Sequence, residues 1–586
     1  MEFSNLVQLS QVSCDKYASR PLFGTKTGGS WRWTTYRELA EMVAKCRGGL
    51  KKLGVGPGDR VAIVADNRLE WVVAAHATYG LGAAFVPMYE VQQPKEWKFI
   101  LEDCGAKVVF GATSAIDEQL QKIAGELDQL EHVVGIALPK SDARSYEALL
   151  AVGADNPAEA TDPSSEDVAG LIYTSGTTGN PKGVLLTHGN ITSNINALHE
   201  IFVFEPEDRS LSFLPWAHSF GQTCELHALM SMGSSLAIND DVKNLVANLA
   251  DVKPTILYAV PRIFNRIYDG VNKQIADKPG VIQSLFAAGV KNAARKNAGE
   301  TLGLVEGATL WLADRVIFSS IRQKFGGRLR YAVSGSAALD KAVAEFIDAL
   351  GIMVYEGYGL TETSPIVTAN YPGHRKIGSV GKAIPGVRVH IDESVSDRPG
   401  EGEIVVYGPN VMQGYHNRED ETRQVLMDDG GFRTGDLGRV DGDGYLAITG
   451  RIKEQYKLEN GKYVMPAPLE EQLKLSPYIA NVLLFGSNKP HNVALVVTDL
   501  DAVHRWADEN GYKLGELNDS KELHSLIEKE IATRGADFKG FERPKRFTIL
   551  GEDFTTENGL LTPTLKLKRR NICERYAAEL DALYDE

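Results

Sequence analysis

The sequence has no paired cysteines. Its 586 residues include five cysteines, and no two of them form a C-x-x-C motif. This spacing gives no sign of a zinc site or a dithiol redox site. Single, scattered cysteines are typical of proteins in a reducing compartment, so we expect a cytoplasmic protein.

Long apolar segments are also missing. The N-terminus, MEFSNLVQLSQVSC, has neither the basic n-region nor the apolar h-region of a signal peptide. The least polar stretch, VVAAHATYGLGAAFVPM, is too short to span a bilayer and is interrupted by His76 and Tyr79. We interpret it as a buried helix followed by a strand. The sequence therefore predicts no transmembrane segment, and it leaves peripheral contact with a membrane open.

The chain has no excess of positive charge. The chain has 63 Lys and Arg against 77 Asp and Glu, a formal net charge of -14. Net acidity disfavours general binding to nucleic acid or to anionic membranes, and we expect no nucleic-acid partner. An anionic ligand would have to be held by local lysines, arginines and backbone N–H groups.

The chain does contain enough apolar material for several cores. Hydrophobic residues make up 43% and charged residues 24%, a balance typical of soluble globular proteins. A length of 586 residues is too great for one core, so several domains are expected.

Helix and strand signals change along the chain. Their alternation over residues 35–110 predicts parallel sheets covered by helices. Residues 151–167 are small, acidic and proline-containing, which indicates an exposed linker. Glycines separate short segments over 376–450, which favours antiparallel strands or a small barrel. We predict an α/β fold, with two α/β subdomains and a distorted β-barrel in residues 1–452 and a small α/β domain in 453–586.

One short loop concentrates groups that bind phosphate. Residues 173–183 read YTSGTTGNPKG, between two segments, VAGLIY and GVLLT, that predict strands. Its glycines allow positive φ, and successive N–H groups in such a loop form an anion nest. Hydroxyl groups and one ammonium add donors, at Thr174, Ser175, Thr177, Thr178 and Lys182. The pattern predicts a polyphosphate site; the alternative is a mobile hairpin tip with a solvated lysine.

This loop is not the common P-loop, because Lys182 is followed by Gly183 and a predicted strand rather than by Ser or Thr and a helix. It resembles the phosphate loop of the acyl-adenylate-forming (AMP-forming) synthetases, the superfamily of acyl-CoA synthetases, firefly-type luciferases and peptide-synthetase adenylation domains. Further motifs follow in the superfamily's order: LPWAHSFG, SGSAAL, YGLTETSP, RTGDLG, GRIKEQYK and LTPTLKLKRR. With the early GDRVAI and GAAFVPMY, the resemblance covers nearly the whole chain.

The resemblance implies an ATP site built from residues far apart in the chain. Tyr358 would pack against adenine, and Asp436 would accept hydrogen bonds from both ribose hydroxyls. Taken alone, a turn aspartate more often bonds its own backbone. The residues implied to bind nucleotide are Thr174, Ser175, Gly176, Thr177, Thr178, Gly179, Lys182, Gly335, Ser336, Ala337, Glu356, Gly357, Tyr358, Gly359, Thr361, Asp436, Arg451, Lys453 and Lys566.

A magnesium ion is implied beside the phosphates. By resemblance, the Thr177 hydroxyl and the Glu362 carboxylate hold it. Mg²⁺ is a hard ion that is usually bound by few carboxylates together with phosphate oxygens, which fits this pair. Considered alone, Glu362 would be a helix-cap residue.

The resemblance also implies chemistry in two steps. A carboxylate attacks the α-phosphate of ATP and pyrophosphate leaves; a thiol then attacks the acyl carbon and AMP leaves. Cations must stabilise the charge of the first step. A C-terminal domain that rotates about a hinge near Lys453 would exchange one lysine for another between the steps. The implied catalytic residues are Lys566 for the first step, Lys457 for the second, His218 beside the substrate carboxylate, and Thr177 and Glu362 through magnesium.

The acyl substrate is indicated by one further stretch. GRIKEQYKLENGKYVMPAPLE departs from the GENI.P.E.E pattern of short-chain and peptide-synthetase members and resembles the long-chain fatty acid–CoA ligases. This implies a fatty acid, ATP and CoA as substrates, with Mg²⁺ as cofactor. Three alternatives stay open: a fatty acyl-AMP ligase that hands the acyl group to a carrier protein, an aryl- or other carboxylate–CoA ligase, and a non-enzymatic adenylate-binding protein.

Overall fold

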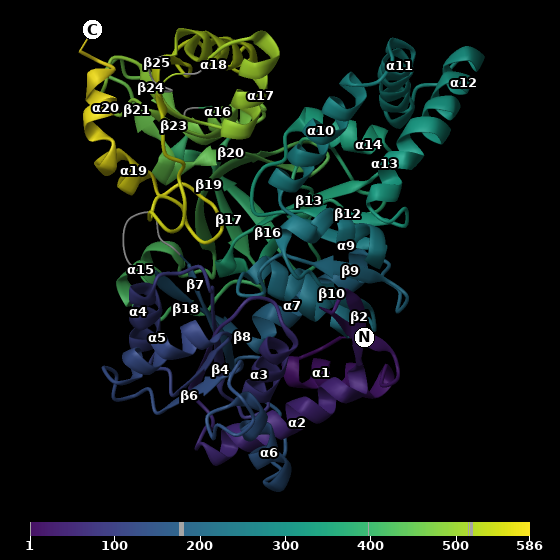
Figure 1. Ribbon diagram of the computed structural model, residues 1–586. Coiled ribbons are helices and arrows are strands. Elements are labelled where there is room, and N and C mark those ends of the chain that lie inside the picture. Colours follow the sequence, from purple (N-terminus) through teal and green to yellow (C-terminus); the bar gives the residue numbers. More distant parts are fainter. Residues whose placement is uncertain (1, 175–180, 397, 514, 516–519, 586) are drawn as a thin grey trace.

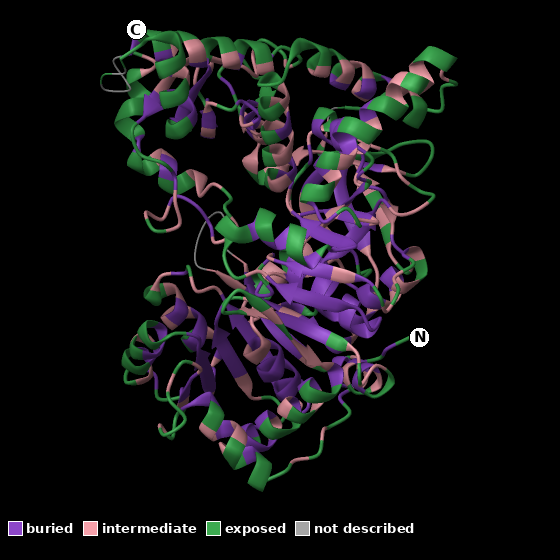
Figure 2. Cartoon of the chain, turned by 45° about the vertical axis from the view of Figure 1, so that its right-hand side comes forward, coloured by how far each residue is buried: buried purple, intermediate pink, exposed green. Residues whose placement is uncertain are grey.

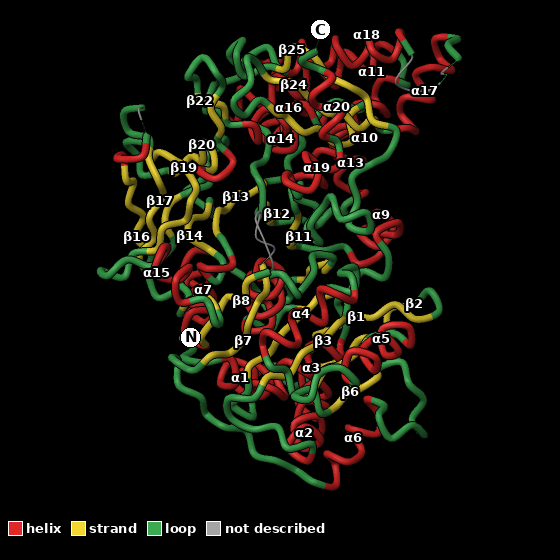
Figure 3. Tube along the Cα trace, turned by 90° about the vertical axis from the view of Figure 1, so that its left-hand side faces the viewer, coloured by secondary structure: helices red, strands yellow, loops and turns green. Residues whose placement is uncertain are grey.

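The computed structural model describes residues 2–174, 181–396, 398–513, 515 and 520–585. The chain forms a large N-terminal part and a smaller C-terminal part, which lies at the top left of Figure 1 in yellow and yellow-green. Helices flank the sheets (Figure 3), and the buried residues lie mainly on the sheets and the inner faces of the helices (Figure 2). This arrangement confirms the predicted α/β fold class.

The first sheet contains the strands that hold the phosphate loop. In spatial order, β18, β8, β7, β4, β3, β5 and β6 lie side by side. The pairs from β7 to β6 are parallel, whereas β8 pairs antiparallel with β7 and with β18. The bounds are β3 (Arg60–Val64), β4 (Ala84–Met88), β5 (Val108–Gly111), β6 (His132–Gly135), β7 (Val168–Thr174), β8 (Lys182–Thr187) and β18 (Gly414–Tyr415).

Helix α3 lies in the interior of this part. Its residues from Trp71 to Tyr79 are all buried, and the Trp71 ring meets Phe85 of β4 edge-on, with 4.9 Å between centroids. A helix that is apolar on every side must be buried, so the predicted buried helix and strand are confirmed as α3 and β4. The helices of this part are α1 (Leu6–Lys16), α2 (Tyr36–Lys52), α3 (Leu69–Tyr79), α4 (Pro94–Cys104), α5 (Ser114–Ala124) and α6 (Tyr146–Asp155).

Helix α6 occupies the first part of the predicted linker. It packs against α2 through glycines: a Cβ on Gly153 would lie 1.7 Å from the Lys45 carbonyl oxygen, and one on Gly48 would lie 2.6 Å from the Gly153 oxygen. The small residues allow two helix backbones to touch. Residues 151–155 are therefore helical rather than a linker, although all of them except Gly153 are exposed as predicted; beyond them the chain has no regular structure until β7.

The second sheet carries the centre of the proposed site. In spatial order its strands are β15, β14, β13, β12, β11, β9, β10, β1 and β2. The pairs from β13 to β1 are parallel, and the pairs at both edges are antiparallel. The bounds are β1 (Pro21–Thr27), β2 (Ser30–Thr35), β9 (Arg209–Ser212), β10 (Ser235–Ile238), β11 (Ile256–Ala259), β12 (Tyr331–Ser334), β13 (Val354–Gly359), β14 (Ile366–Ala369) and β15 (Lys382–Ala383).

Helices and short helical turns connect these strands. A π-helix, η1 (Phe220–His227), follows β9 and is mostly buried. A helical projection between β11 and β12 extends away from the sheet, at the upper right of Figure 1. The elements are α7 (His188–Ile201), α8 (Ala228–Ser231), η2 (Val242–Asn244), α9 (Leu245–Val252), α10 (Pro261–Ala276), α11 (Gly280–Asn297), α12 (Leu304–Ala313), η3 (Asp314–Phe318), α13 (Ser319–Lys324), α14 (Lys341–Ala349) and η4 (Thr361–Thr363).

The glycine-rich region forms a small antiparallel sheet. Its strands are β16 (Arg388–Asp392), β17 (Gly402–Tyr407), β19 (Phe432–Val440) and β20 (Leu446–Arg451), with η5 (Glu393–Val395) and α15 (Glu419–Val425) between them. Each neighbouring pair in the order β16, β17, β19, β20 is antiparallel. The antiparallel arrangement is confirmed, and closure into a barrel stays a prediction.

The C-terminal part has a sheet between two layers of helices. In β24 alternate side chains face opposite layers: Val493 and Leu495 pack with α19 and α20, and Ala494 and Val496 with α16 to α18. Among the described residues, no helix is both long and apolar enough to cross a membrane. The elements are η6 (Ile452–Glu454), β21 (Tyr456–Lys457), β22 (Tyr463–Val464), α16 (Pro466–Leu473), β23 (Ile479–Phe485), β24 (Asn492–Thr498), α17 (Leu500–Asn510), α18 (Lys521–Arg534), β25 (Pro544–Leu550), α19 (Arg569–Arg575) and α20 (Ala577–Ala582).

Candidate active site

Two parallel strands end side by side at the centre of the candidate site. Strands β12 and β13 pair with Ser334 opposite Glu356. The loop after Ser334 therefore lies next to the last residues of β13. Ligands of α/β sheets bind beyond the carboxyl ends of such strands. This arrangement brings together two sets of predicted nucleotide residues, 335–337 and 357–359.

The loop after β12 has a defined shape. Ser336 has a φ of +70°, in the left-handed region, and a Cβ on Gly335 would lie 3.2 Å from the Phe220 ring. Glu356 is buried and accepts a hydrogen bond from the Leu339 backbone N–H at 3.2 Å. Burial raises the pKa of Glu356 to about 7. Glu356 thus holds the loop, and its contact with nucleotide stays a prediction.

A buried aspartate connects the second sheet with the small antiparallel sheet. Asp436 lies opposite Arg451 in the pairing of β19 with β20. One carboxylate oxygen accepts from Arg451 Nε at 2.6 Å, and the other accepts from the Tyr358 hydroxyl at 2.7 Å. The carboxylate raises the pKa of Arg451, and burial raises that of Tyr358. Three residues predicted at the ribose and adenine are therefore in direct contact.

Glu362 bonds a tyrosine that sequence reasoning missed. The Tyr415 hydroxyl donates to Glu362 Oε1 at 2.8 Å, and Lys182 Nζ lies 5.1 Å from the Tyr415 ring centroid. Tyr415 reaches this position because β18 pairs with β8, with Tyr415 opposite Val184. The Glu362 carboxylate thus accepts a hydrogen bond from a side chain of β18. A helix-cap residue would instead bond the backbone of its own helix. No local motif marks Tyr415, since its partner is 53 residues away.

His218 lies just before η1, close to the same centre. Its Nδ1 accepts a hydrogen bond from the Phe220 backbone N–H at 3.2 Å. Burial, aided by the charge of Lys566, lowers the pKa of His218 to about 4. The ring is therefore neutral at neutral pH, and its hydrogen is on Nε2. The neighbouring Ser219 hydroxyl lies 3.3 Å from that of Thr361, which ties this segment to η4.

Lys566 is presented by a tight turn of the C-terminal part. Thr562 exchanges two hydrogen bonds with the backbone of Lys566, of 2.8 and 3.1 Å, and Leu565 between them has a φ of +61°. A non-glycine residue in this conformation costs on the order of 1 kcal/mol, so the rest of the turn must hold it. Lys566 is exposed to solvent as a whole residue, but the protein atoms around its ammonium desolvate it, and this desolvation and then the charge of Arg451 lower its pKa.

Lys566 lies near several charged residues of the candidate site. Besides Arg451, its charge interacts with Asp436, Glu454 and Glu362. Contacts between the two parts support this placement: Lys568 pairs with Glu96 at 3.5 Å, and Gln93 donates to the Glu557 carbonyl at 3.2 Å.

Lys457 has different surroundings. It lies on β21, and its Nζ is 5.4 Å from the Tyr463 ring of the neighbouring β22. Asn488, also in the C-terminal part, donates its backbone N–H to the Lys457 carbonyl. Lys453 is exposed in η6, the short turn between β20 and β21. The structure therefore brings Lys566 into the candidate site and places Lys457 on a hairpin of the C-terminal part.

Part of the phosphate loop lies outside the described residues. Ser175, Gly176, Thr177, Thr178 and Gly179 fall there. Thr174 and Lys182 pair across β7 and β8, which confirms that the loop joins two strands. Within the described ranges, no group of three or more His, Cys, Asp or Glu is arranged to hold a metal. The magnesium prediction therefore depends on Glu362, Thr177 and phosphate oxygens.

A buried network lies behind the His218 segment. Glu225 of η1 accepts hydrogen bonds from the Ser210 and Ser212 hydroxyls at 2.5 and 2.7 Å. Ser212 in turn accepts from the Trp216 indole N–H at 3.0 Å. Burial raises the pKa of Glu225 to about 7 in spite of these donors. The network fixes the segment that carries His218.

The raised pKa of Glu225 gives a pH-dependent prediction. The folded protein keeps the Glu225 proton up to about pH 7, whereas the unfolded chain loses it near pH 4.5. The contribution of this group to the free energy of unfolding therefore falls as pH rises through that interval, by about 3 kcal/mol. Relative to wild type, Glu225→Gln should become more stable as pH rises. Denaturant unfolding between pH 4.5 and 8 measures this, with the exposed Glu200→Gln as control; a pH-independent difference between Glu225→Gln and wild type would contradict it.

Known proteins are similar to this chain in sequence. The pattern of the AMP-binding enzyme family matches residues 10–416, and that of the AMP-binding enzyme C-terminal domain matches 453–586. The long-chain-fatty-acid–CoA ligase FadD15 of Mycobacterium tuberculosis is 35% identical, over 95% of this chain and 93% of that protein. Long chain acyl-CoA synthetase 7, peroxisomal, of Arabidopsis thaliana is 33% identical, over 98% and 85%. Long-chain-fatty-acid–CoA ligase 1 of Homo sapiens is 30% identical, over 96% and 84%.

Solved structures agree on the fold. The adenylation domain of a carboxylate reductase from Mycobacterium chelonae aligns with a TM-score of 0.80 at 22% identity, over 99% of this chain and 91% of that one. The anthranilate CoA ligase AuaEII, in complex with anthranoyl-AMP, aligns with a TM-score of 0.75 at 23% identity, over 99% and 98%. Since the family pattern covers residues 10–416, more than half of the chain, and relatives at 30–35% identity extend over nearly its full length, this protein belongs to the AMP-binding enzyme family.

Proposed function

We propose that the protein activates a long-chain fatty acid with ATP to an acyl-adenylate, and then transfers the acyl group to CoA, releasing AMP and pyrophosphate. The main observation behind this proposal is the position of Lys566 in the C-terminal part. Its charge interacts with Arg451, Asp436 and Glu362 of the N-terminal part. The relatives named as long-chain ligases, at 30–35% identity over nearly the full length, support the choice of acid.

The nucleotide would bind at Asp436. Each of its carboxylate oxygens already accepts one hydrogen bond, from Arg451 or Tyr358. A carboxylate has about four acceptor positions, so each oxygen can still accept one ribose hydroxyl. The same contacts fix the Tyr358 ring for packing against adenine, next to the loop held by Glu356.

In the first step, positive charge would offset the repulsion between two anions. The substrate carboxylate attacks the α-phosphate, and negative charge develops on the phosphate oxygens. Lys566 would stabilise that charge, and Lys182 would contact the phosphates released as pyrophosphate. His218 is neutral because its pKa is lowered to about 4, so its Nε2–H can donate to the substrate carboxylate without adding charge. Preorganised donors of this kind are usually the largest single contribution to such catalysis.

A magnesium ion would be held by Glu362 and Thr177 together with phosphate oxygens. One carboxylate and one hydroxyl fit a hard cation that shares its coordination sphere with phosphate. When bound, the ion would offset charge on the triphosphate. Tyr415 would orient the Glu362 carboxylate through its hydrogen bond.

The second step would use a different position of the C-terminal domain. We place this domain at residues 453–586 and the hinge at Lys453, where the turn η6 separates β20 from β21. Rotation there would remove Lys566 and bring Lys457 to the acyl-adenylate, as in other hinge mechanisms. Compartment is part of the same proposal: the five free cysteines, four of them buried, agree with a cytoplasmic enzyme.

Substrate length gives a direct test. Each CH₂ buried in an apolar site contributes up to about 0.8 kcal/mol, or about fourfold in kcat/KM. We expect kcat/KM in a CoA-dependent AMP-release assay to rise over several carbons and peak at a long-chain acid. A peak at acetate or benzoate would contradict the fatty-acid assignment and favour an aryl- or short-chain ligase. Adenylate formation without consumption of CoA would favour transfer to a carrier protein.

A further inference from the structure

Helix α12 has an apolar face that points into solvent. The side chains of Leu304, Val305 and Trp311 are 95%, 80% and 62% exposed, and Leu312 is exposed as well. With Ala308, these residues recur at helical spacing and so share one side of the helix. An amphipathic helix of a soluble domain normally turns this side inward.

The opposite side of α12 contacts α11, with Leu310 partly buried and Ala313 buried. Ala313 is buried at its end, and a Cβ on Gly289 of α11 would lie 2.5 Å from the Ala313 Cβ. Phe318, in the turn that follows, packs edge-on against Phe286 of α11, with 5.9 Å between ring centroids. The two helices therefore pack together as one projection, at the upper right of Figure 1.

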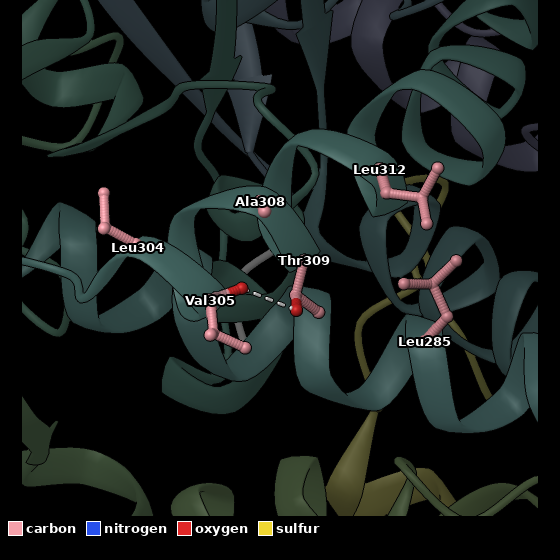
Figure 4. Close-up of a pocket in the computed structure, with 6 residues that line it drawn as sticks. All are labelled: Leu285, Leu304, Val305, Ala308, Thr309 and Leu312. Atoms are coloured by element: carbon pink, nitrogen blue, oxygen red, sulfur yellow. Dashed lines mark hydrogen bonds between the residues drawn. The ribbon is translucent and has the colours of Figure 1, made fainter.

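The outer face also forms an apolar groove. Figure 4 shows its lining, which comes from α12 and from Leu285 of α11: Leu285, Leu304, Val305, Ala308, Thr309 and Leu312. The one polar side chain is satisfied within the helix, because the Thr309 hydroxyl donates to the Val305 carbonyl at 2.8 Å. A surface with this lining can leave water without breaking a hydrogen bond to solvent.

The charge of the projection is opposite to that of the protein. Helices α10 to α13, residues 261–324, contain ten Lys and Arg against five Asp and Glu, while the whole chain has a net charge of -14. The acidic residues of the tip are paired: Glu300 and Glu306 with Arg295, and Asp314 with Arg322. Arg315 is exposed, and its guanidinium lies 5.8 Å from the Trp311 ring. Further exposed cations are Lys278, Lys291 and Lys296.

From these observations we infer that the outer face of α12 docks onto an anionic lipid bilayer. Helices with an apolar side that includes Trp and Leu, and with Lys and Arg around it, lie in the interface between headgroups and acyl chains. Indole rings prefer this depth, and cations attract the anionic headgroups. The acidic remainder of the protein would be repelled from the same surface, so docking would have one orientation.

Docking would place the enzyme where its substrate is concentrated. This benefit rests on the proposed long-chain fatty acid, which partitions into bilayers through its CH₂ groups. The docking itself does not depend on the substrate and is measured without it. A failure of docking and a failure of the proposed activity are therefore separate results.

The test is co-sedimentation of the full chain with vesicles of phosphatidylcholine, with and without phosphatidylglycerol. We expect wild type to bind the anionic vesicles, and the triple variant Leu304→Ser/Val305→Ser/Trp311→Ser to lose at least about tenfold in partitioning. The matched control is Val203→Ser/Val242→Ser/Leu500→Ser. It replaces three apolar side chains that are also exposed but lie outside α12, and it should bind like wild type. Circular dichroism and the melting temperature establish that each variant is folded.

Charge is tested by a second pair of variants. Lys291→Glu/Lys296→Glu/Arg315→Glu should lose the preference for phosphatidylglycerol, whereas Lys51→Glu/Lys52→Glu/Lys122→Glu, with the same change in net charge on other exposed helices, should keep it. Absence of wild-type binding, or equal binding by the α12 variants and their controls, overturns the proposal. Concentration-dependent dimers in sedimentation velocity that the α12 triple variant abolishes, without vesicle binding, would show that the face joins two copies of this chain instead.

Discussion

Replacement of Lys566 by alanine is expected to lower the rate of acyl-adenylate formation by about two orders of magnitude or more, the scale for losing a charge-assisted contact in the transition state. The physical reason is the position of the ammonium among Arg451, Asp436 and Glu362. Conversion of supplied acyl-adenylate to acyl-CoA should hardly change. ATP–pyrophosphate exchange and thioester formation from synthetic acyl-adenylate measure the two steps separately.

Lys457→Ala is the matched variant. Lys457 lies on a hairpin of the C-terminal part, beside Tyr463, so its loss should spare adenylation and slow thioester formation. The two variants together test the rotation about Lys453, because one domain position cannot serve both lysines. Loss of the same step in both variants, or of neither step selectively, would show that the domain does not alternate in this protein.

Glu362→Gln is expected to lower adenylation by about two to three orders of magnitude, since a preorganised carboxylate beside the triphosphate would be lost. The change keeps the size of the side chain and its capacity to accept the hydrogen bond from Tyr415. If Glu362 binds Mg²⁺, the variant should also need a higher Mg²⁺ concentration for half-maximal rate. Initial rates over a magnesium titration at saturating ATP measure both effects.

Two controls separate metal binding from local structure. Tyr415→Phe removes the hydrogen bond and keeps the carboxylate, so its effect on the magnesium requirement should be much smaller than that of Glu362→Gln. Glu421→Gln removes a neighbouring carboxylate that pairs with Lys182 at 3.7 Å and should leave the magnesium dependence unchanged. A near-normal rate and magnesium dependence in Glu362→Gln would make Glu362 a structural residue.

Much of what the sequence could predict depends on residues that lie close together in the chain. The loop YTSGTTGNPKG combines glycines, hydroxyls and a lysine within eleven residues, and the flanking apolar runs predict the strands that the structure has as β7 and β8. The apolar stretch that contains His76 likewise predicts α3 and β4. In these cases the residues that carry the signal are neighbours in the chain, so periodicity and composition are sufficient.

The same reasoning failed at α6, where small residues led to the prediction of a linker. Glycine and alanine near Gly153 favour a linker without regular structure, but here they allow helix α6 to touch α2. Net charge is likewise an average, because a total of -14 conceals a projection in which cations outnumber acids two to one. Composition averages over residues that the fold separates.

By itself, the sequence determined the α/β class, the two strands on either side of the glycine-rich loop, and the set of motif residues. Only the tertiary structure decided which of them meet: Asp436 bonds both Tyr358 and Arg451, and Lys566 lies near enough to interact with their charges. It alone revealed Tyr415 beside Glu362 and the outward apolar face of α12. The physical reason is that these contacts join residues tens to hundreds of positions apart, and their free energy depends on strand pairing and helix packing that no local pattern encodes.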